Sequence, residues 1–223
     1  EATSKAYWEY FQTQCPDEFK ETQVLALHVH GPGMFHTVAK QVKSAADLRG
    51  LKLRGPTRQV TKLLGALGAI PVGMPLPQIP DALSKGTIEG CVIPWEVVPS
   101  VKVHELTKFH SEFPAGRPAL YTTTFVMAMN KAKYDAMSPA QKKVIDDHCS
   151  PEWAAKVATP WANYEAAGRD KLRAAAGHTV YKISDAQVAQ WQKAAEPLSK
   201  IWADNIKKAN AGDPDAMLKA LKD

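Results

Sequence analysis

The stretch from Leu51 to Ile93 limits the possible folds of this chain more than any other. Short apolar runs typical of strands alternate there with segments of helical period, with Gly or Pro at most of the boundaries. We expect strands at 51–54, 69–72 and 88–93, and helices at 57–67 and 80–86. Strands and helices that alternate through short connections are typical of βαβ units, so the sequence predicts an α/β fold.

The regions on either side have a different pattern. Residues 3–22 are predicted to be a helix and residues 23–30 a short strand, and residues 121–130 form a longer β-rich run. From 138 to 222 the chain is predicted to be almost entirely helical, apart from an expected edge strand at 177–183.

The composition excludes several classes of protein. Of the 223 residues, 45% are hydrophobic and 23% are charged, so the chain is not predominantly disordered. No apolar run approaches the roughly 18 residues that a membrane-spanning helix needs. The net charge is 28 − 23 = +5, and the basic residues are spaced singly, whereas a nucleic-acid-binding protein more often clusters them.

The sequence contains no motif of a common catalytic or nucleotide-binding site, and its three cysteines fit no metal motif. His28 and His30 share one face of the predicted strand at 23–30, and His36 follows six residues later. These histidines are open to three interpretations: a metal site, hydrogen-bonding groups that line a pocket, or ordinary histidines of a strand.

Arg54 ends the predicted strand at 51–54, directly before Gly55 and Pro56. In α/β sheets, ligands bind at the carboxyl ends of strands. A guanidinium group there can bind a carboxylate through two parallel charge-assisted hydrogen bonds. From the pattern alone, a surface arginine at a sheet edge remains the alternative.

Trp95 and Glu96 follow the predicted strand at 88–93 in a similar way. An indole beside a carboxylate provides an apolar wall and a polar group for a small organic ligand. The alternative is that Trp95 belongs to the hydrophobic core. One face of the run 121–130, either ligand-contacting or part of an ordinary strand, adds the candidates Tyr121, Thr123 and Phe125.

Residues 47–56, with the sequence D-L-R-G-L-K-L-R-G-P, resemble the solute-binding proteins of TRAP transporters, the DctP-type family. In that family this block is followed by L-G-A-x-P and later by G-x-hydrophobic-D/E-G. Here L-G-A-I-P occupies 67–71 and G-T-I-E-G occupies 86–90. Further similarity at 129–134 and 137–144 extends the resemblance over nearly the whole chain.

The resemblance implies a two-lobed periplasmic binding protein, α/β in both lobes, with the ligand in the cleft between them. Members of the family are longer than this chain, which therefore looks like one that lacks its opening stretch, so that its first lobe is incomplete. We expect residues 1–31 and 120–159 to be the remainder of the first lobe. Residues 32–119 and 160–223 would form the second lobe.

The resemblance also implies a function. The chain would be a periplasmic receptor rather than an enzyme, and it would deliver a small carboxylate to the membrane subunits of a TRAP transporter without any cofactor or nucleic acid. The carboxylate-binding arginine of the family matches Arg54. Ile93 and Met34 stand where some members carry an asparagine and a second arginine, so a monocarboxylate with an apolar or aromatic body is expected. The expected ligand-binding residues are Arg54, Trp95, Glu96, Phe35, Tyr121, Thr123, Phe125 and His30.

Two further expectations accompany this interpretation. The alternative function is a metal-dependent hydrolase that uses His28, His30 and His36. An incomplete first lobe would also leave strand edges and apolar faces without partners, and such edges invite pairing with another chain. Residues 1–31 and 120–159 are therefore expected to be mobile or to mediate self-association.

Overall fold

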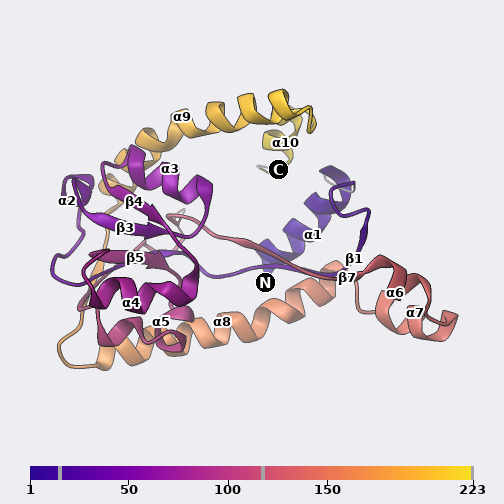
Figure 1. Ribbon diagram of the computed structural model, residues 1–223, viewed down its shortest axis with the longest axis horizontal. Helices are drawn as coiled ribbons and strands as arrows, with labels where there is room; N and C mark the ends of the chain where they lie inside the picture. Colours follow the sequence, from indigo (N-terminus) through magenta and orange to yellow (C-terminus); the bar gives the residue numbers. More distant parts are fainter. Residues whose placement is uncertain (15–16, 117–118, 222–223) are drawn as a thin grey trace. The chain divides into compact units, whose positions relative to one another are not determined.

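The structure is a computed structural model that describes residues 1–14, 17–116 and 119–221 (Figure 1). The chain forms two compact units. Unit 1 comprises Glu1–His30, Thr122–Asn163 and Ala211–Asp223, whereas unit 2 comprises Gly31–Tyr121 and Tyr164–Asn210. The helix over Asp185–Ala209 ends where Asn210 adopts a left-handed conformation (φ 50°), and the last segment of unit 1 begins at Ala211.

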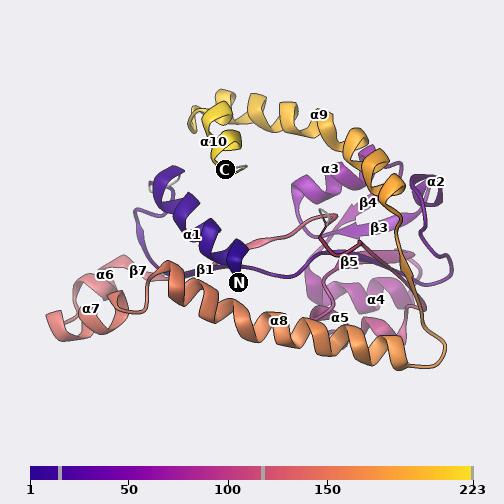
Figure 2. The ribbon, with the colours of Figure 1, turned by 180° about the vertical axis from the view of Figure 1, so that it is seen from behind.

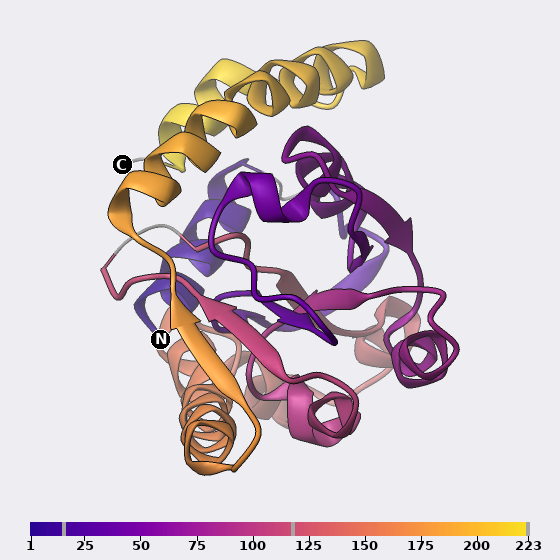
Figure 3. The same cartoon turned by 90° about the vertical axis from the view of Figure 1, so that its left-hand side faces the viewer.

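Unit 2 is built on a six-stranded mixed sheet (Figure 3). In spatial order the strands are β4 (Ile70–Gly73), β3 (Lys52–Gly55), β5 (Gly90–Ile93), β2 (Met34–Thr37), β6 (Phe109–Glu112) and β8 (Thr179–Lys182). Strand β3 is parallel to both of its neighbours, β4 and β5, and β6 is parallel to β8. Strand β2 runs antiparallel to both of its neighbours, β5 and β6.

Helices cover both faces of this sheet, so its central strands are buried throughout. Alternate residues point to opposite faces. Phe35 and Val92 point into one core with α3 (Arg58–Ala66) and α9 (Asp185–Ala209). The neighbouring Met34 and Ile93 point into a second core on the other face, formed with α4 (Ile79–Ser84), α5 (Val97–Ser100) and α8 (Pro151–Ala174).

The short elements of unit 2 follow from local sequence. In α2 (Ala45–Leu48), Ser44 and Asp47 form a capping box, and in α3 the hydroxyl of Thr57 accepts a hydrogen bond from the backbone of Val60. The 3₁₀ helices η1 (Leu76–Gln78) and η2 (Val103–Glu105) complete the connections of this unit.

Unit 1 contains a two-stranded antiparallel sheet of β1 (Thr22–Val29) and β7 (Thr124–Asn130). Helix α1 (Ala2–Gln14) lies beside β1 (Figure 2). Trp8, Leu27 and Ala154 form a small core there. Helices α6 (Lys131–Asp135), α7 (Pro139–Asp146) and α10 (Pro214–Ala220) also belong to this unit, as does the first part of α8.

Several predicted elements differ from the observed ones. The helix expected over 3–22 ends at Gln14 among the described residues. Strands β2 and β6 were not predicted, because these four-residue strands have neither the apolar run nor the alternation that marks a strand. The β-rich run begins at Thr124 rather than at 121, so Tyr121 and Thr123 do not lie on the face of a strand with Phe125. Strand β8 is an edge strand, as expected.

Candidate ligand-binding site

Arg54 lies near the carboxyl end of β3, a central strand of unit 2, and is 95% buried, with 5% of its surface exposed. The alternation of the strand places Leu53 in the core, and Gly55 and Pro56 then turn the chain toward Thr57 and α3. The sequence had left open a surface arginine at a sheet edge. The burial of this side chain argues against that alternative.

The guanidinium group of Arg54 is held by two backbone carbonyl groups. Its Nε donates to Met74 O at 3.1 Å and its Nη1 to Val92 O at 3.5 Å. A guanidinium group has five N–H donors, so one on Nη1 and both on Nη2 are left for a ligand. No aspartate or glutamate among the described residues forms an ion pair with it.

Burial lowers the pKa of Arg54, while the nearby Tyr121 and Cys91 act in the opposite direction. Arginine nevertheless stays charged in proteins. A poorly solvated cation with unused donors binds an anion more strongly than one that water surrounds, because less hydration is lost when the anion arrives. The side chain is therefore suited to hold a carboxylate.

An open depression of about 830 Å³ lies beside Arg54 in unit 2. The start of α3 contributes the exposed side chains of Arg58 and Lys62, one helical turn apart. No acidic residue lines the depression, and the positive end of a helix dipole also favours an anion. Its lining consists of Arg54, Gly55, Pro56, Thr57, Arg58, Thr61, Lys62, Gly73, Met74, Pro75 and Leu76.

Tyr121 is linked to Arg54 through a shared carbonyl group. The hydroxyl of Tyr121 donates to Val92 O at 3.0 Å, the same oxygen that receives Nη1 of Arg54. Burial raises the pKa of Tyr121, so this phenol stays protonated and keeps donating at physiological pH. Its own carbonyl oxygen accepts from the backbone of Gly33 at 2.9 Å. Tyr121 therefore helps to fix the strand end that presents Arg54.

The other candidates of unit 2 lie deeper. Trp95 is fully buried, and its ring contacts the imidazoles of His36 and His110 at centroid distances of 5.0 and 5.3 Å. Phe35 is also fully buried and packs edge-on against Trp191 at 5.5 Å. Both side chains are core residues in this structure. The carboxyl group of Glu96 is buried as well and faces a second acid, described below.

The histidines form a hydrogen-bonded row within unit 2. Nε2 of His36 lies 3.1 Å from Ile93 O, an acceptor, so this nitrogen carries the proton and Nδ1 of His36 accepts. Nδ1 of His110 then donates to Nδ1 of His36 at 2.8 Å, and Nε2 of His110 accepts from Nδ1 of His178 at 3.0 Å. Burial lowers the pKa of His36 to about 4 and that of His110 to about 2, so the row is neutral.

These contacts do not support the metal-dependent hydrolase that was the alternative. Both ring nitrogens of His36 are occupied, whereas a metal ligand needs a free lone pair. Within the described ranges, no three His, Cys, Asp or Glu side chains are grouped in a way that could hold a metal ion.

The remaining candidates lie in unit 1, around the ring of His28. His28 pairs across the strands with Phe125 and stacks on it at 5.0 Å, and Trp161 of α8 lies 5.2 Å from His28. Nε2 of His30 accepts from the backbone N–H of Thr123 at 3.2 Å. Phe125 is 37% exposed, so part of its ring remains accessible in this unit.

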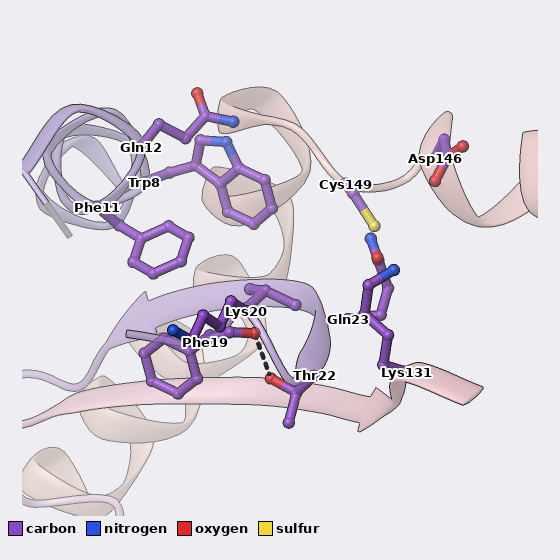
Figure 4. A pocket seen from close by; sticks show the side chains of 11 residues that line it. Trp8, Phe11, Gln12, Phe19, Lys20, Thr22, Gln23, Lys131, Asp146 and Cys149 are labelled. Atoms are coloured by element: carbon purple, nitrogen blue, oxygen red, sulfur yellow. Dashed lines mark hydrogen bonds between the residues drawn. The ribbon is translucent and has the colours of Figure 1, made fainter. Parts of the chain in front are cut away.

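Unit 1 also has a depression of about 390 Å³, shown in Figure 4. Trp8, Phe11 and Phe19 form its aromatic side, and the thiol of Cys149 lies on the opposite side (Figure 4). The charged side chains at its rim are Lys20, Lys131 and Asp146. Because this charge is mixed, the depression lacks the purely positive lining of the one at Arg54.

Sequence reasoning missed three residues that shape these sites: Glu165, His110 and Met74. Glu165 lies in the middle of a long helix, and His110 lies in an unpredicted strand. Met74 acts through its carbonyl group, which no side-chain pattern reveals. Each is far in sequence from its partner, so only the folded chain brings them together.

Comparison with known proteins identifies the family. The family model of the bacterial extracellular solute-binding proteins, family 7 (DctP), matches residues 2–205. The chain belongs to the DctP family. Members of this family are solute-binding receptors and not enzymes, and the family is periplasmic. The resemblance inferred from residues 47–56 is thereby confirmed.

Two solved structures are similar over almost the whole chain. A TRAP solute-binding protein from Rhodoferax ferrireducens, in complex with copurified benzoate, is 54% identical with a TM-score of 0.94, and the match covers 99% of this chain and 68% of that one. A marine metagenome TRAP protein specific for aromatic acid ligands, in complex with 3-hydroxybenzoate, is 46% identical with a TM-score of 0.91, covering 99% and 68%. These matches confirm the predicted α/β, two-lobed binding-protein fold.

A curated relative shows how much of a longer protein the chain spans. The outer membrane transporter protein TsaT of Comamonas testosteroni is 24% identical over 218 residues, and the match covers 96% of this chain and 63% of the relative. The chain thus spans less than two thirds of the length of that relative. No helix in the described part of the chain is long and apolar enough to cross a bilayer.

Proposed function

We propose that this DctP-family chain is part of a receptor that binds an aromatic monocarboxylate, with Arg54 as the residue that holds the carboxylate. The observation that carries the proposal is the state of Arg54: a buried cation with three unused N–H donors and no acidic partner among the described residues. Two of those donors, one on each Nη, match the spacing of the two oxygens of a carboxylate.

The proposed class of ligand is supported by the ligands of two similar proteins and by two positions where apolar residues replace the polar ones of some family members. The two similar solved proteins hold benzoate and 3-hydroxybenzoate. Ile93 and Met34, which replace polar residues of some family members, are both buried in apolar surroundings. Neither side chain can form a hydrogen bond with a sugar hydroxyl, so an aromatic acid fits better than a highly hydroxylated sugar acid. The roles of Trp95, Glu96, Phe35, Tyr121, Thr123, Phe125 and His30 in binding remain predictions.

The receptor would act in the periplasm and deliver its ligand to the membrane subunits of a TRAP transporter. This part of the proposal is supported by the family and by the TRAP proteins that the chain resembles. The chain itself supplies the carboxylate-binding group.

Calorimetric titration with benzoate tests the role of Arg54. Arg54→Lys keeps the charge but loses the planar pair of donors, so we expect the dissociation constant to rise at least about tenfold, or about 1.4 kcal/mol. Arg58→Lys, in the same depression but exposed, is the matched control and should change affinity little. Equal affinities of Arg54→Lys and the unmodified chain would remove Arg54 from the site, and no binding of benzoate or 3-hydroxybenzoate would refute the proposed ligand class.

We also propose that the chain self-associates through unit 1. Phe125 and Met127 lie on one face of the strand β7 and are 37% and 62% exposed, and Val126 on the other face is 40% exposed, which is unusual for apolar side chains of a two-stranded sheet. Met127→Lys places a charge on the face of Phe125 and Met127 and should shift the chain toward monomer in analytical ultracentrifugation, whereas Val144→Lys on α7 should not. A monomeric unmodified chain at all concentrations would contradict this part.

A further inference from the structure

Two carboxyl groups face each other inside unit 2. Glu96 precedes α5 and is 2% exposed, and Glu165 lies in the part of α8 that belongs to this unit. All four carboxyl oxygens are buried, and none has a well-formed hydrogen bond to a donor among the described residues. Two buried carboxyl groups that face each other with no cation paired to them are costly to ionise together, so the arrangement favours a proton on one of them.

The two groups interact directly, and this interaction changes their acidity. Burial raises the pKa of Glu96 to about 9, with the contact to Glu165 as the next cause. Burial also raises the pKa of Glu165, although the backbone N–H groups of Trp95 and Glu96 favour its charged form. Two adjacent carboxyl groups in a site of low polarity keep one proton between them, because both cannot be charged at once.

The pair is fixed by close backbone packing on both sides. An ideal Cβ at Gly168 would lie 2.7 Å from Trp95 O, so only glycine lets α8 approach the turn that carries Glu96. An ideal Cβ at Gly31 would overlap the carboxyl group of Glu165, which therefore occupies the space above this glycine. The two acids thus have little room to separate if both become charged.

We infer that Glu96 and Glu165 form a proton-binding site that holds one proton at neutral pH. The shared proton keeps the turn at Trp95 and Glu96 in contact with the turn of α8 that carries Glu165 and with Gly31. This site lies where the chain enters and leaves unit 2. Gly31 is the first residue of unit 2, and Tyr121 is the last residue of the first segment of this unit. The chain returns to unit 2 at Tyr164, directly before Glu165. Loss of the proton would loosen these connecting segments.

Other titratable groups around the pair do not replace the proton. Arg169, one turn further along α8, favours the charged form of Glu165, but its Nε already pairs with Asp170 at 3.3 Å. Tyr121 faces the pair as a neutral phenol, and beyond it lie Arg54 and Cys91. The buried Cys91 has a pKa raised to about 12 and stays neutral.

The pH dependence of stability between about pH 7.5 and 8 tests the inference. In this narrow window the unfolded histidines are nearly all neutral, and the unfolded cysteines and tyrosines have kept most of their protons. The folded chain holds a proton that the unfolded chain has lost, so stability falls as pH rises. The opening constant of unit 2 should increase by up to about tenfold per pH unit, measured by hydrogen exchange of the β5 amides corrected for the intrinsic rate.

Glu96→Gln supplies an amide N–H donor in place of the shared proton, so its opening constant should not change across this window. Glu196→Gln, on the exposed side of α9, is the matched control and should keep the slope of the unmodified chain. If Glu96→Gln does not fold, Glu165→Gln makes the same test. Infrared spectroscopy of the unmodified chain at pH 7 should show the band of a protonated carboxyl group without any substitution.

Four results would overturn the inference. The first is an opening constant that is independent of pH in the unmodified chain, and the second is the same slope in Glu96→Gln. The third is the absence of the protonated carboxyl band at pH 7. Stabilisation of the unmodified chain by Ca²⁺ at pH 8, lost in Glu96→Gln, would likewise overturn it, because the pair would then hold a cation rather than a proton.

Discussion

Acidification should destabilise unit 2 through its row of histidines. His36 and His110 are fully buried and neutral in the folded chain, with pKa values lowered to about 4 and about 2. In the unfolded chain both titrate near about 6.5. Below that pH the two histidines bind protons in the unfolded chain but not in the folded chain. The free energy of unfolding therefore decreases as the pH falls.

The size of the effect follows from these differences. Each pKa unit corresponds to about 1.4 kcal/mol, so lowering the pH from about 8 to about 5 costs about 2 kcal/mol for each of the two histidines. The sum of about 4 kcal/mol is a large part of the 5–15 kcal/mol that typically stabilises a domain. Near pH 5.5 the two histidines contribute a slope of about two protons. The proton held by Glu96 and Glu165 only in the folded chain opposes it by about one, so the net slope should correspond to about one proton.

Hydrogen exchange of the β2 and β6 amides, which report the opening of unit 2, measures this slope. His36→Phe should lower the slope by about one proton per pH unit, whatever the variant's stability at neutral pH. His148→Gln, an exposed histidine of unit 1, should leave it unchanged. An unmodified chain whose protection is flat between pH 6 and 5, or a His36→Phe variant with an unaltered slope, would refute the reasoning.

Two further substitutions probe the strand end and the helix beside Arg54. Tyr121→Phe removes the hydrogen bond to Val92 O, but that oxygen keeps its contact with Arg54. The free energy of unfolding, measured by denaturant titration, should therefore fall by about 1 kcal/mol. A change near zero would mean that the hydroxyl does not fix this strand end. Thr57→Ala removes the N-cap of α3, and circular dichroism during denaturation should show a cost of about 1 kcal/mol, whereas Thr57→Ser should cost less.

The βαβ part of unit 2 was predictable because its signals are local. Strand periodicity, the turn at Gly55 and Pro56 and the cap at Thr57 each lie within a few residues of the element that they define. The position of Arg54 at a strand end follows from the same signals. Strands β2 and β6 were not predicted because they contain polar residues, which usually indicate an exposed segment. These residues are buried here because they form hydrogen bonds with residues far away in sequence, as His36 does with His110.

The candidate site shows the same limit. The sequence placed His36 with His28 and His30, its neighbours along the chain, whereas the structure pairs it with His110 and joins His178 to the row. Trp95 follows a strand as a pocket residue would, yet α8 and the histidines enclose it completely. Side-chain types reveal which groups can do chemistry, but tertiary packing decides which of them solvent can reach.

The parallel pairing of β6 with β8 also has a consequence for biosynthesis. Strand β8 enters the sheet beside β6, with Phe109 opposite Thr179, and the intervening chain builds part of unit 1. A ribosome that adds about 5–20 residues per second completes β6 several seconds before β8 emerges. Throughout that interval the nascent sheet exposes the edge of β6, so this strand is where a chaperone would have to shield the growing polypeptide.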